Sequence, residues 1–142
     1  MLFDKNKDKL LLDLQRKLIN GEYETSEYYV FKIYEPKERE IFKLPYYPDR
    51  IVHHAIMNIM EPIWVSAFVK GTYSCIRKRG IHKALKDVKF ALKDEINTQY
   101  CLKLNIRKFY PSIDHDILKT IIRKKIKDKR LLSLLDEIIE SA

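Results

Sequence analysis

Hydrophobic and polar positions recur with two different periods along this chain, and the changes of period mark the elements we expect. From residue 5 to 19, leucines recur at the spacing of one helix face and charged residues fill the other face. Asn20-Gly21 is a natural stop for that helix. From residue 28 to 43 the pattern alternates on both sides of the turn EPKER, which predicts a β-hairpin with a charged tip.

Four further helices and one strand follow from the same patterns. A helix over 48–63 carries Pro48 in its first turn, and Pro62 either ends or kinks it. A loop is expected over 68–79 and a helix over 81–95, whose apolar face is expected to point inward. Residues 100–105 read as a short buried strand, and Asp114 caps a helix over 117–126 that is followed by another over 131–139.

Composition narrows the classes of protein that this chain can represent. Its 142 residues are 46% hydrophobic, which is enough to form a core, and they carry a formal net charge of +8. Such a charge favours a polyanionic partner, most simply nucleic acid, although a lysine-rich soluble surface explains it equally simply. Only three glycines are present and no Gly-rich loop occurs, which argues against a P-loop or Rossmann enzyme.

Targeting signals and cysteines point to the cytoplasm. The chain has no apolar run long enough to span a membrane, and its first residues lack the features of a signal peptide. Cys75 and Cys101 do not have the spacing of metal ligands. We therefore expect both to be reduced thiols in the core of a cytoplasmic protein that does not engage a membrane.

The segment YCLKLNIRKFYPSIDHDIL, residues 100–118, combines an apolar strand, a basic and aromatic turn, and a capped helix. Read without context, it is an ordinary strand–turn–helix with a buried Phe–Tyr pair. In its order of residues, however, it closely resembles the first palm motif of reverse transcriptases. The resemblance is to the bacterial and phage types, such as those of diversity-generating retroelements or group II introns.

This resemblance implies a site for nucleotidyl transfer. Asn105 stands where the family carries a metal-binding aspartate, Ile106 would lend its backbone carbonyl to the metal, and Tyr110 would lie beneath the incoming sugar. The metal implied is Mg²⁺ or Mn²⁺. Because an amide oxygen has no charge, metal binding at Asn105 should be severely weakened. The sequence leaves open whether Asn105 is an inactivating change, the mark of a degenerate family member or a sequence error.

Two basic segments resemble the fingers motifs of the same family. In the hairpin, the resemblance implies that Arg39, assisted by Lys37, contacts the triphosphate of the incoming nucleotide. A solvated charged turn is the alternative. In YSCIRKRGIHKAL it implies that Arg77, Lys78 and Arg79 face template or primer phosphates. A basic surface loop is the alternative for each of these three.

The expected fold is therefore α+β: an N-terminal helix and linker (1–27), a helical fingers subdomain with a β-hairpin (28–98), and the first strand and helices of a palm (99–142). The resemblance implies an RNA-directed DNA polymerase that uses an RNA template, a DNA or RNA primer and deoxynucleoside triphosphates. With Asn105 and no Y-x-D-D motif, we expect this chain to be an N-terminal part that is inactive alone. The alternatives are a non-catalytic RNA-binding module and a form that self-associates through an unpaired sheet edge.

Overall fold

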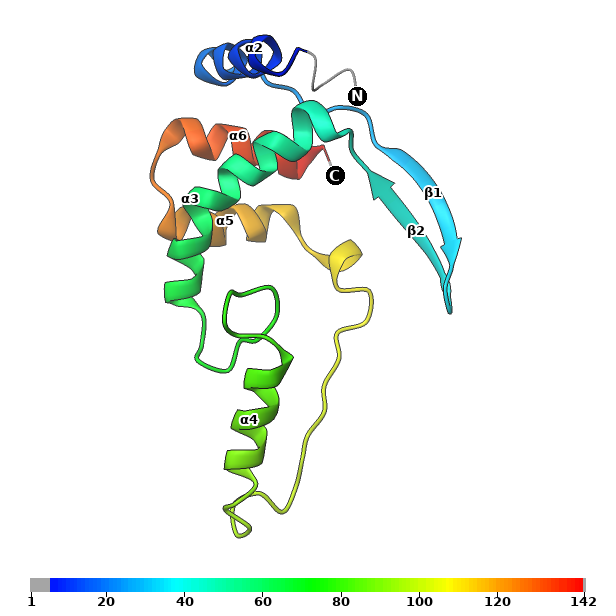
Figure 1. The fold of residues 1–142 in the computed structure, drawn as a ribbon, viewed down its shortest axis with the longest axis vertical. Coiled ribbons are helices and arrows are strands. Elements are labelled where there is room, and N and C mark those ends of the chain that lie inside the picture. Colours follow the sequence, from blue (N-terminus) through cyan, green and yellow to red (C-terminus); the bar gives the residue numbers. More distant parts are fainter. Residues whose placement is uncertain (1–5, 142) are drawn as a thin grey trace. The chain divides into compact units, whose positions relative to one another are not determined.

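The computed structural model describes residues 6–141, which form a mixed α+β structure (Figure 1). This confirms the expected fold class at the level of five α-helices and one two-stranded sheet within the described part. The elements are α2 (Lys7–Asn20), β1 (Tyr29–Tyr34), β2 (Glu38–Lys43), α3 (Ile51–Ala67), α4 (Ile81–Ala91), α5 (His115–Lys125) and α6 (Lys129–Glu140). None of the helices in the described range is long and apolar enough to cross a bilayer.

The chain divides into two compact units. Unit 1 joins the residues up to Asn58 with those from Ile113 onward, and unit 2 is Ile59–Ser112. Helix α3 begins in unit 1 and ends in unit 2. The boundaries differ from the expected division at residues 27 and 98, which therefore stays a prediction about subdomains of a larger fold.

Helix α2 ends where the sequence predicts. Gly21 adopts a left-handed conformation with φ of 73°, which glycine reaches without the strain of a Cβ atom. Its N–H and that of Glu22 donate to carbonyls of the last turn. Gly21 and Glu22 together end this helix, because their backbone N–H groups satisfy carbonyls of its last turn.

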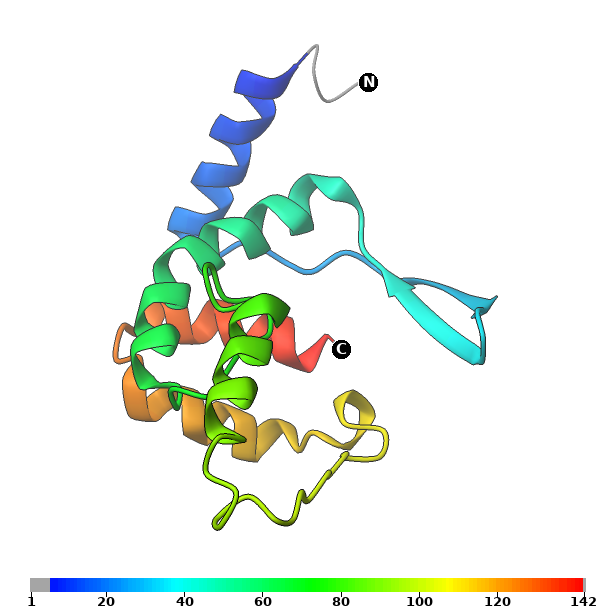
Figure 2. The same ribbon diagram turned by 60° about the horizontal axis from the view of Figure 1, so that its bottom comes forward.

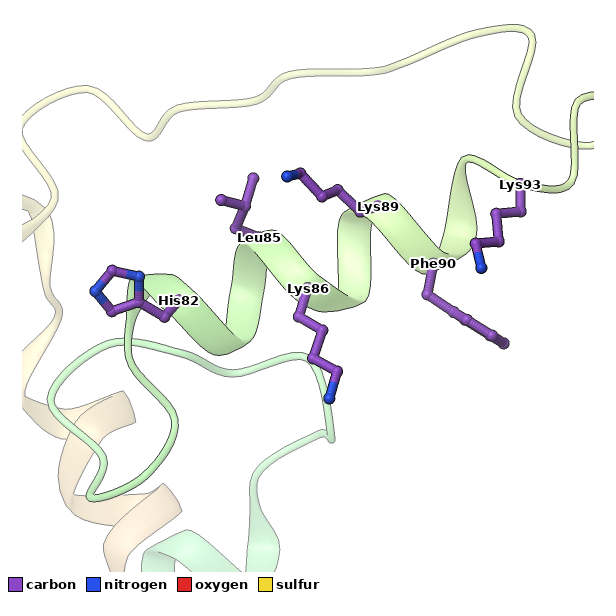
Figure 3. Close-up of a pocket in the computed structure, with 6 residues that line it drawn as sticks. All are labelled: His82, Leu85, Lys86, Lys89, Phe90 and Lys93. Atoms are coloured by element: carbon purple, nitrogen blue, oxygen red, sulfur yellow. The ribbon is translucent and has the colours of Figure 1, made fainter.

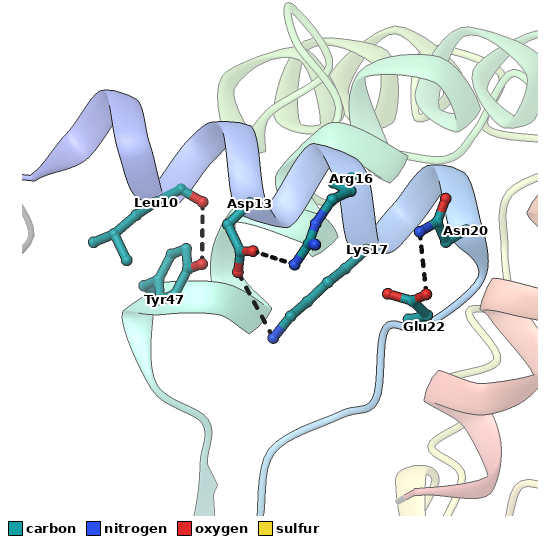
Figure 4. A network of polar contacts seen from close by, with 7 residues as sticks. All are labelled: Leu10, Asp13, Arg16, Lys17, Asn20, Glu22 and Tyr47. Carbon is teal, nitrogen blue, oxygen red and sulfur yellow. Dashed lines mark hydrogen bonds and ion pairs between the residues drawn. The ribbon is translucent and has the colours of Figure 1, made fainter.

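Polar contacts run along α2 and join it to the turn that precedes α3 (Figure 4). Asp13 pairs with Arg16 at 2.8 Å and with Lys17 at 3.8 Å, and the Tyr47 hydroxyl donates to the Leu10 carbonyl at 3.1 Å. The ion pairs are exposed, so each contributes well under about 1 kcal/mol. The Tyr47 bond connects α2 with the turn that precedes α3.

The hairpin forms in the predicted place, with antiparallel pairing that sets Phe31 opposite Ile41 and Ile33 opposite Arg39. Since side chains alternate across a strand, these four share one face, on which Phe31, Ile33 and Ile41 are half-buried. Arg39 therefore emerges from the more apolar face of the hairpin, near its tip.

Helices α5 and α6 lie side by side in unit 1 (Figure 2). Ion pairs join them at two levels, between Lys119 and Glu140 and between Arg123 and Asp136. The buried hydrophobic residues of unit 1 come from α2, the segments flanking the hairpin, α3, and the α5–α6 pair: Leu14, Tyr23, Leu44, Val52, Ile56, Ile122, Ile126 and Leu135. The helical periodicity of the sequence accounts for most of this core.

Three expectations about helices need correction. Pro62 lies inside α3, which continues to Ala67, so it does not end the helix. Helix α4 stops at Ala91, four residues short of the expected end at residue 95. Its apolar face does not point inward, because Leu85, Val88 and Leu92 are each more than half exposed. Within unit 2 the only buried hydrophobic side chain is Met60, so α4 has no core to pack against.

The expected buried strand at residues 100–105 is also absent. This segment has no regular secondary structure, and its alternating apolar side chains Leu102 and Leu104 are both 81% exposed. A strand needs a neighbour to receive its backbone hydrogen bonds. Among residues 6–141 the only two strands pair with each other, so none is left to receive this segment.

Both cysteines differ from the expectation in one respect. Cys75 and Cys101 are free thiols, as predicted, but both are exposed rather than buried in the core. Cys101 lies in the unpaired segment described above, and Cys75 lies in the loop before α4 with φ of 54°.

Candidate functional site

The turn around Asn105 is the first candidate site. Asn105 and Ile106 end the extended segment and are exposed, with Ile106 at 65%. A tight turn follows, in which Lys108 has φ of 49°. The chain then forms a single 3-10 turn at Tyr110–Ser112, where the Ser112 hydroxyl donates to the Phe109 carbonyl at 2.8 Å. Local hydrogen bonds therefore hold the turn, while Asn105 itself stands at the end of an unsupported segment.

Two aromatic rings mark this turn. Phe109 and Tyr110 meet edge to face, with centroids 5.3 Å apart and planes inclined at 69°. The phenol of Tyr110 is 83% exposed, so its ring is open to a ligand. Phe109 and Tyr110 therefore contact each other, but neither ring is buried, in contrast to an ordinary core pair.

Asp114 behaves as the helix cap that the sequence predicts. Its carboxylate accepts a hydrogen bond from the Ile117 backbone N–H at 2.9 Å. This satisfies one of the open donors at the start of α5. Asp114 is therefore engaged in the structure at the start of α5.

The side chains present do not fit a divalent metal site. Mg²⁺ is held by several hard oxygen ligands, of which carboxylates supply the compensating charge. In the part of the chain that the structure describes, no group of three or more His, Cys, Asp or Glu side chains gathers where a metal ion would bind. Asn105 offers one neutral oxygen in an exposed position. The expected Mg²⁺ or Mn²⁺ therefore has no binding site built from these residues.

The loop Arg77–Arg79 is the second candidate site. Lys78 has φ of 64°, and the Arg79 N–H closes a turn onto the Ile76 carbonyl at 3.0 Å. Arg77 and Lys78 are exposed, whereas Arg79 is half-buried and its Nη1 is buried without a partner among the described residues. The loop thus presents two cations to solvent and holds a third closer to the protein.

A hydrogen-bonded network joins this loop to α4. The Tyr73 hydroxyl donates to the Asp87 carboxylate at 2.8 Å, and Lys83 donates to the other oxygen of that carboxylate. The bond from Lys83 and that from Tyr73 lower the pKa of Asp87, while its carboxylate raises the pKa of the Tyr73 phenol. Asp87 is therefore charged at neutral pH and positions the loop against the helix.

Lys37 and Arg39 lie at the tip of the hairpin in unit 1 and are exposed. A neighbouring ion pair, between Lys32 and Glu38, closes the hairpin. Asn105, Ile106, Tyr110 and the Arg77–Arg79 loop all belong to unit 2. The predicted site residues are thus divided between the two units.

Sequence reasoning missed a buried polar centre in unit 1. Asp49 is 0% exposed and accepts hydrogen bonds from the Tyr23 hydroxyl at 2.8 Å and the Ser26 N–H at 3.1 Å. Burial alone would raise the pKa of Asp49, but the bonds from Ser26 and Tyr23 hold it below its ordinary value. Burial, and then Asp49 itself, raise the pKa of Tyr23. The sequence shows Asp49 only as the start of a helix, because its partners lie far away along the chain.

Comparison with curated proteins places the chain among known relatives. It is 29% identical over 133 residues to Protein YkfC of Escherichia coli, which covers 90% of this chain and 34% of YkfC. It is 25% identical over 98 residues to the Group II intron-encoded protein LtrA of Lactococcus lactis, covering 69% of this chain and 16% of LtrA. It is 21% identical over 122 residues to Nuclear intron maturase 1, mitochondrial, of Arabidopsis thaliana, covering 86% of this chain and 16% of that protein.

The chain is a distant homologue of the group II intron-encoded reverse transcriptases and maturases. This relationship confirms the family resemblance that residues 100–118 suggest. No family model matches the chain. The chain spans about a third of YkfC and about a sixth of LtrA and of the nuclear maturase.

Within this reverse transcriptase and maturase homologue, the structure also shows a surface that the sequence analysis did not single out. A groove of about 420 Å³ runs along one face of α4, lined by His82, Leu85, Lys86, Lys89, Phe90 and Lys93 (Figure 3). The sequence contains the signal, since lysines at intervals of three and four residues share one helix face. That signal was obscured by the apolar positions of the same helix, which predict a buried face.

Proposed function

We propose that this chain provides the fingers subdomain (28–98) and the beginning of the palm (99–142) of an RNA-directed DNA polymerase related to the group II intron-encoded proteins. The observation that carries the proposal is the basic Arg77–Arg79 loop, which lies between Tyr73, bonded to Asp87 of α4, and the start of α4 itself, in a homologue of that family. A loop of this kind suits contact with a phosphate backbone, which needs cations held in place but open to solvent.

The residues have separate roles in this proposal. Arg77, Lys78 and Arg79 contact phosphates of the RNA template or its DNA or RNA primer. Lys37 and Arg39, at the exposed hairpin tip, contact the triphosphate of the incoming deoxynucleotide. Tyr110 supplies an open aromatic ring for the sugar. The proposed location is the cytoplasm, where free thiols such as Cys75 and Cys101 stay reduced.

We further propose that these 142 residues bind nucleic acid but do not catalyse nucleotidyl transfer on their own. In that reaction a primer 3′-hydroxyl attacks the α-phosphate of the nucleotide and pyrophosphate leaves, and carboxylate-bound metal ions offset the developing charge. The resemblance puts Asn105 where the family has a metal-binding aspartate, and no group of three or more potential metal ligands gathers in the described range. The alternative is a non-catalytic RNA-binding module, which the neutral side chain of Asn105 favours.

The experiment that tests the RNA-binding proposal is fluorescence anisotropy of a labelled single-stranded RNA. The variant Arg77→Ala/Arg79→Ala is compared with Lys7→Ala/Lys9→Ala, which removes the same charge from the exposed start of α2. We expect the arginine variant to bind at least tenfold more weakly at 0.1 M salt, because two phosphate contacts are lost. Equal affinities for the two variants would contradict the proposed role of the loop.

Primer extension on an RNA template tests the proposal about catalysis. We expect no product above a no-protein control with the wild-type chain. We also expect none with Asn105→Asp, because a single restored carboxylate does not complete a two-metal site. Extension by the wild-type chain would show that Asn105 supports catalysis and would overturn this part of the proposal.

A further inference from the structure

Helix α4 carries a row of three lysines, in line with a histidine at its start, that none of the predicted sites includes. His82, Lys86, Lys89 and Lys93 follow one another at intervals of three or four residues, at the start of α4, along it and just beyond its end. At 3.6 residues per turn, these four positions fall within an arc of about 60° and extend over about 16 Å of helix axis. We call these four residues the α4 stripe.

The α4 stripe lines a groove between two rows of side chains (Figure 3). Leu85 and Lys89 point to one side of the groove, and Lys86 and Phe90 point to the other. The Phe90 ring is 74% exposed, and the Lys93 ammonium lies 6.0 Å from its centroid. The groove therefore offers cations along its length and an open aromatic ring near one end.

The charge of the α4 stripe is not neutralised within the described part of the protein. No ion pair there joins Lys86, Lys89 or Lys93 to a carboxylate. The one acidic residue of α4, Asp87, is already engaged by Tyr73 and Lys83. Like charges at this spacing repel one another weakly, and an anionic partner would offset that repulsion.

We infer that the α4 stripe binds the phosphates of a single-stranded nucleic acid and that a base stacks on Phe90. Lysines that recur along one face of a helix can contact successive phosphates of the same strand. An aromatic ring beside a basic groove is the arrangement that binds single strands without reading their sequence. The α4 stripe begins three residues after the Arg77–Arg79 loop, and both belong to unit 2. The inference rests on the proposed function and deepens it.

An anionic lipid surface is a different partner for a basic amphipathic helix, and α4 also exposes an apolar face. Nucleic acid is the better match because three lysines line the groove together with Leu85 and Phe90. The helix has only 11 residues, which limits the apolar area that it can insert. Vesicle binding is therefore an outcome of the test that would overturn the inference.

The test compares two double variants of equal charge by anisotropy with a labelled single-stranded RNA, across a series of salt concentrations. Lys89→Gln/Lys93→Gln changes the α4 stripe, and Lys7→Gln/Lys9→Gln is the matched control on α2. Each phosphate contact with a single strand contributes about 0.7 to the slope of log affinity against log salt. We expect the stripe variant to lose about 1.4 from that slope and to bind about 25-fold more weakly at 0.1 M salt. The control is expected to stay within about twofold of wild type.

Measurements with DNA, with a variant of Phe90 and with lipid vesicles distinguish the possible outcomes. Equal losses for RNA and for DNA of the same length support recognition of the shared phosphate backbone, and a loss for only one of them assigns the α4 stripe to that nucleic acid. Phe90→Leu is expected to weaken binding about fivefold or more without changing the salt slope. A stripe variant that binds as wild type, while Arg77→Ala/Arg79→Ala loses binding, would overturn this inference and leave the proposed function intact. If the wild-type chain binds anionic phosphatidylserine vesicles through Lys89 and Lys93 but no nucleic acid, both are overturned.

Discussion

At the scale of single residues, Asp49 shows how a charge is kept inside a small core. Its carboxylate has no exposed surface, yet hydrogen bonds from Tyr23 and Ser26 favour the ionised form. The second oxygen, Oδ2, has no partner in the described part of the protein. Because burying a charge is unfavourable unless it is well hydrogen-bonded, this centre should be sensitive to small changes.

Asp49→Asn is expected to lower the free energy of unfolding by about 2 to 3 kcal/mol. The amide keeps the shape of the side chain but loses the hydrogen bonds that a charged acceptor makes, and it buries additional donors. Chemical denaturation followed by circular dichroism would measure the change. Asp13→Asn, in an exposed ion pair on α2, is the control and should cost less than about 1 kcal/mol. Equal effects of the two substitutions would contradict the account of Asp49.

The free energy of unfolding is expected to decrease as the solution becomes more acidic than the ordinary pKa of an aspartate, because of Asp49. Its pKa is lower in the folded state than the ordinary value of 3.8, so the unfolded state binds the proton more readily. The contribution is complete above the ordinary value and is lost as pH falls through the folded pKa. Urea denaturation from pH 6 down to pH 2 would show the decline. In Asp49→Asn the decline should be shallower, and an unchanged profile would contradict this assignment.

At the scale of elements, the sequence predicts features that depend on neighbouring residues, and it fails for features that depend on partners far along the chain. The end of α2 at Gly21 and the cap of α5 at Asp114 depend on neighbouring backbone, and both were predicted. The burial of α4 and the strand at 100–105 depend on a packing surface or a partner strand, and both predictions were wrong. Periodicity reports which face of an element is apolar, but not whether anything covers that face.

The caps of α5 and α6 provide a prediction at this scale. Asp114 accepts from the Ile117 N–H and Asp128 from the Leu131 N–H, at 2.9 and 2.8 Å. Replacing either aspartate by alanine is expected to lower the free energy of unfolding by about 1 kcal/mol, since an N-terminal donor loses its partner. Thermal melts would show it, with Glu35→Ala at the exposed hairpin turn as the control. A control as destabilising as the cap variants would argue against this role.

At the scale of the whole molecule, order is unevenly distributed along the chain. The buried hydrophobic residues belong to unit 1 except for Met60, which lies on α3. The chain between α4 and α5 has little regular structure, and residues 99–112 are exposed throughout. The predicted site around Asn105 thus sits in the least supported part of the described chain. Sequence reasoning located this site by its residue order, which carries no information on how well the site is supported.

Limited trypsin digestion is expected to cut first after Lys103, Arg107 or Lys108. These bonds lie in an exposed segment with few backbone hydrogen bonds, whereas the many basic sites of α5 are held in a helix. Mass spectrometry of early time points would identify the cuts. First cleavage inside α5 or α6 would contradict this order of local stability. Binding of nucleic acid to unit 2 is expected to slow cleavage at these three sites.

The buried phenol of Tyr23 also gives the protein an optical label of its own. Burial and Asp49 raise its pKa above the ordinary value of 10, and they do so only while Tyr23 is buried beside Asp49. An ultraviolet titration of the nine tyrosines should therefore leave a fraction of the phenolate absorbance undeveloped while unit 1 is folded. That missing absorbance would appear only when the Tyr23–Asp49 centre opens, so the integrity of unit 1 can be followed without adding a dye.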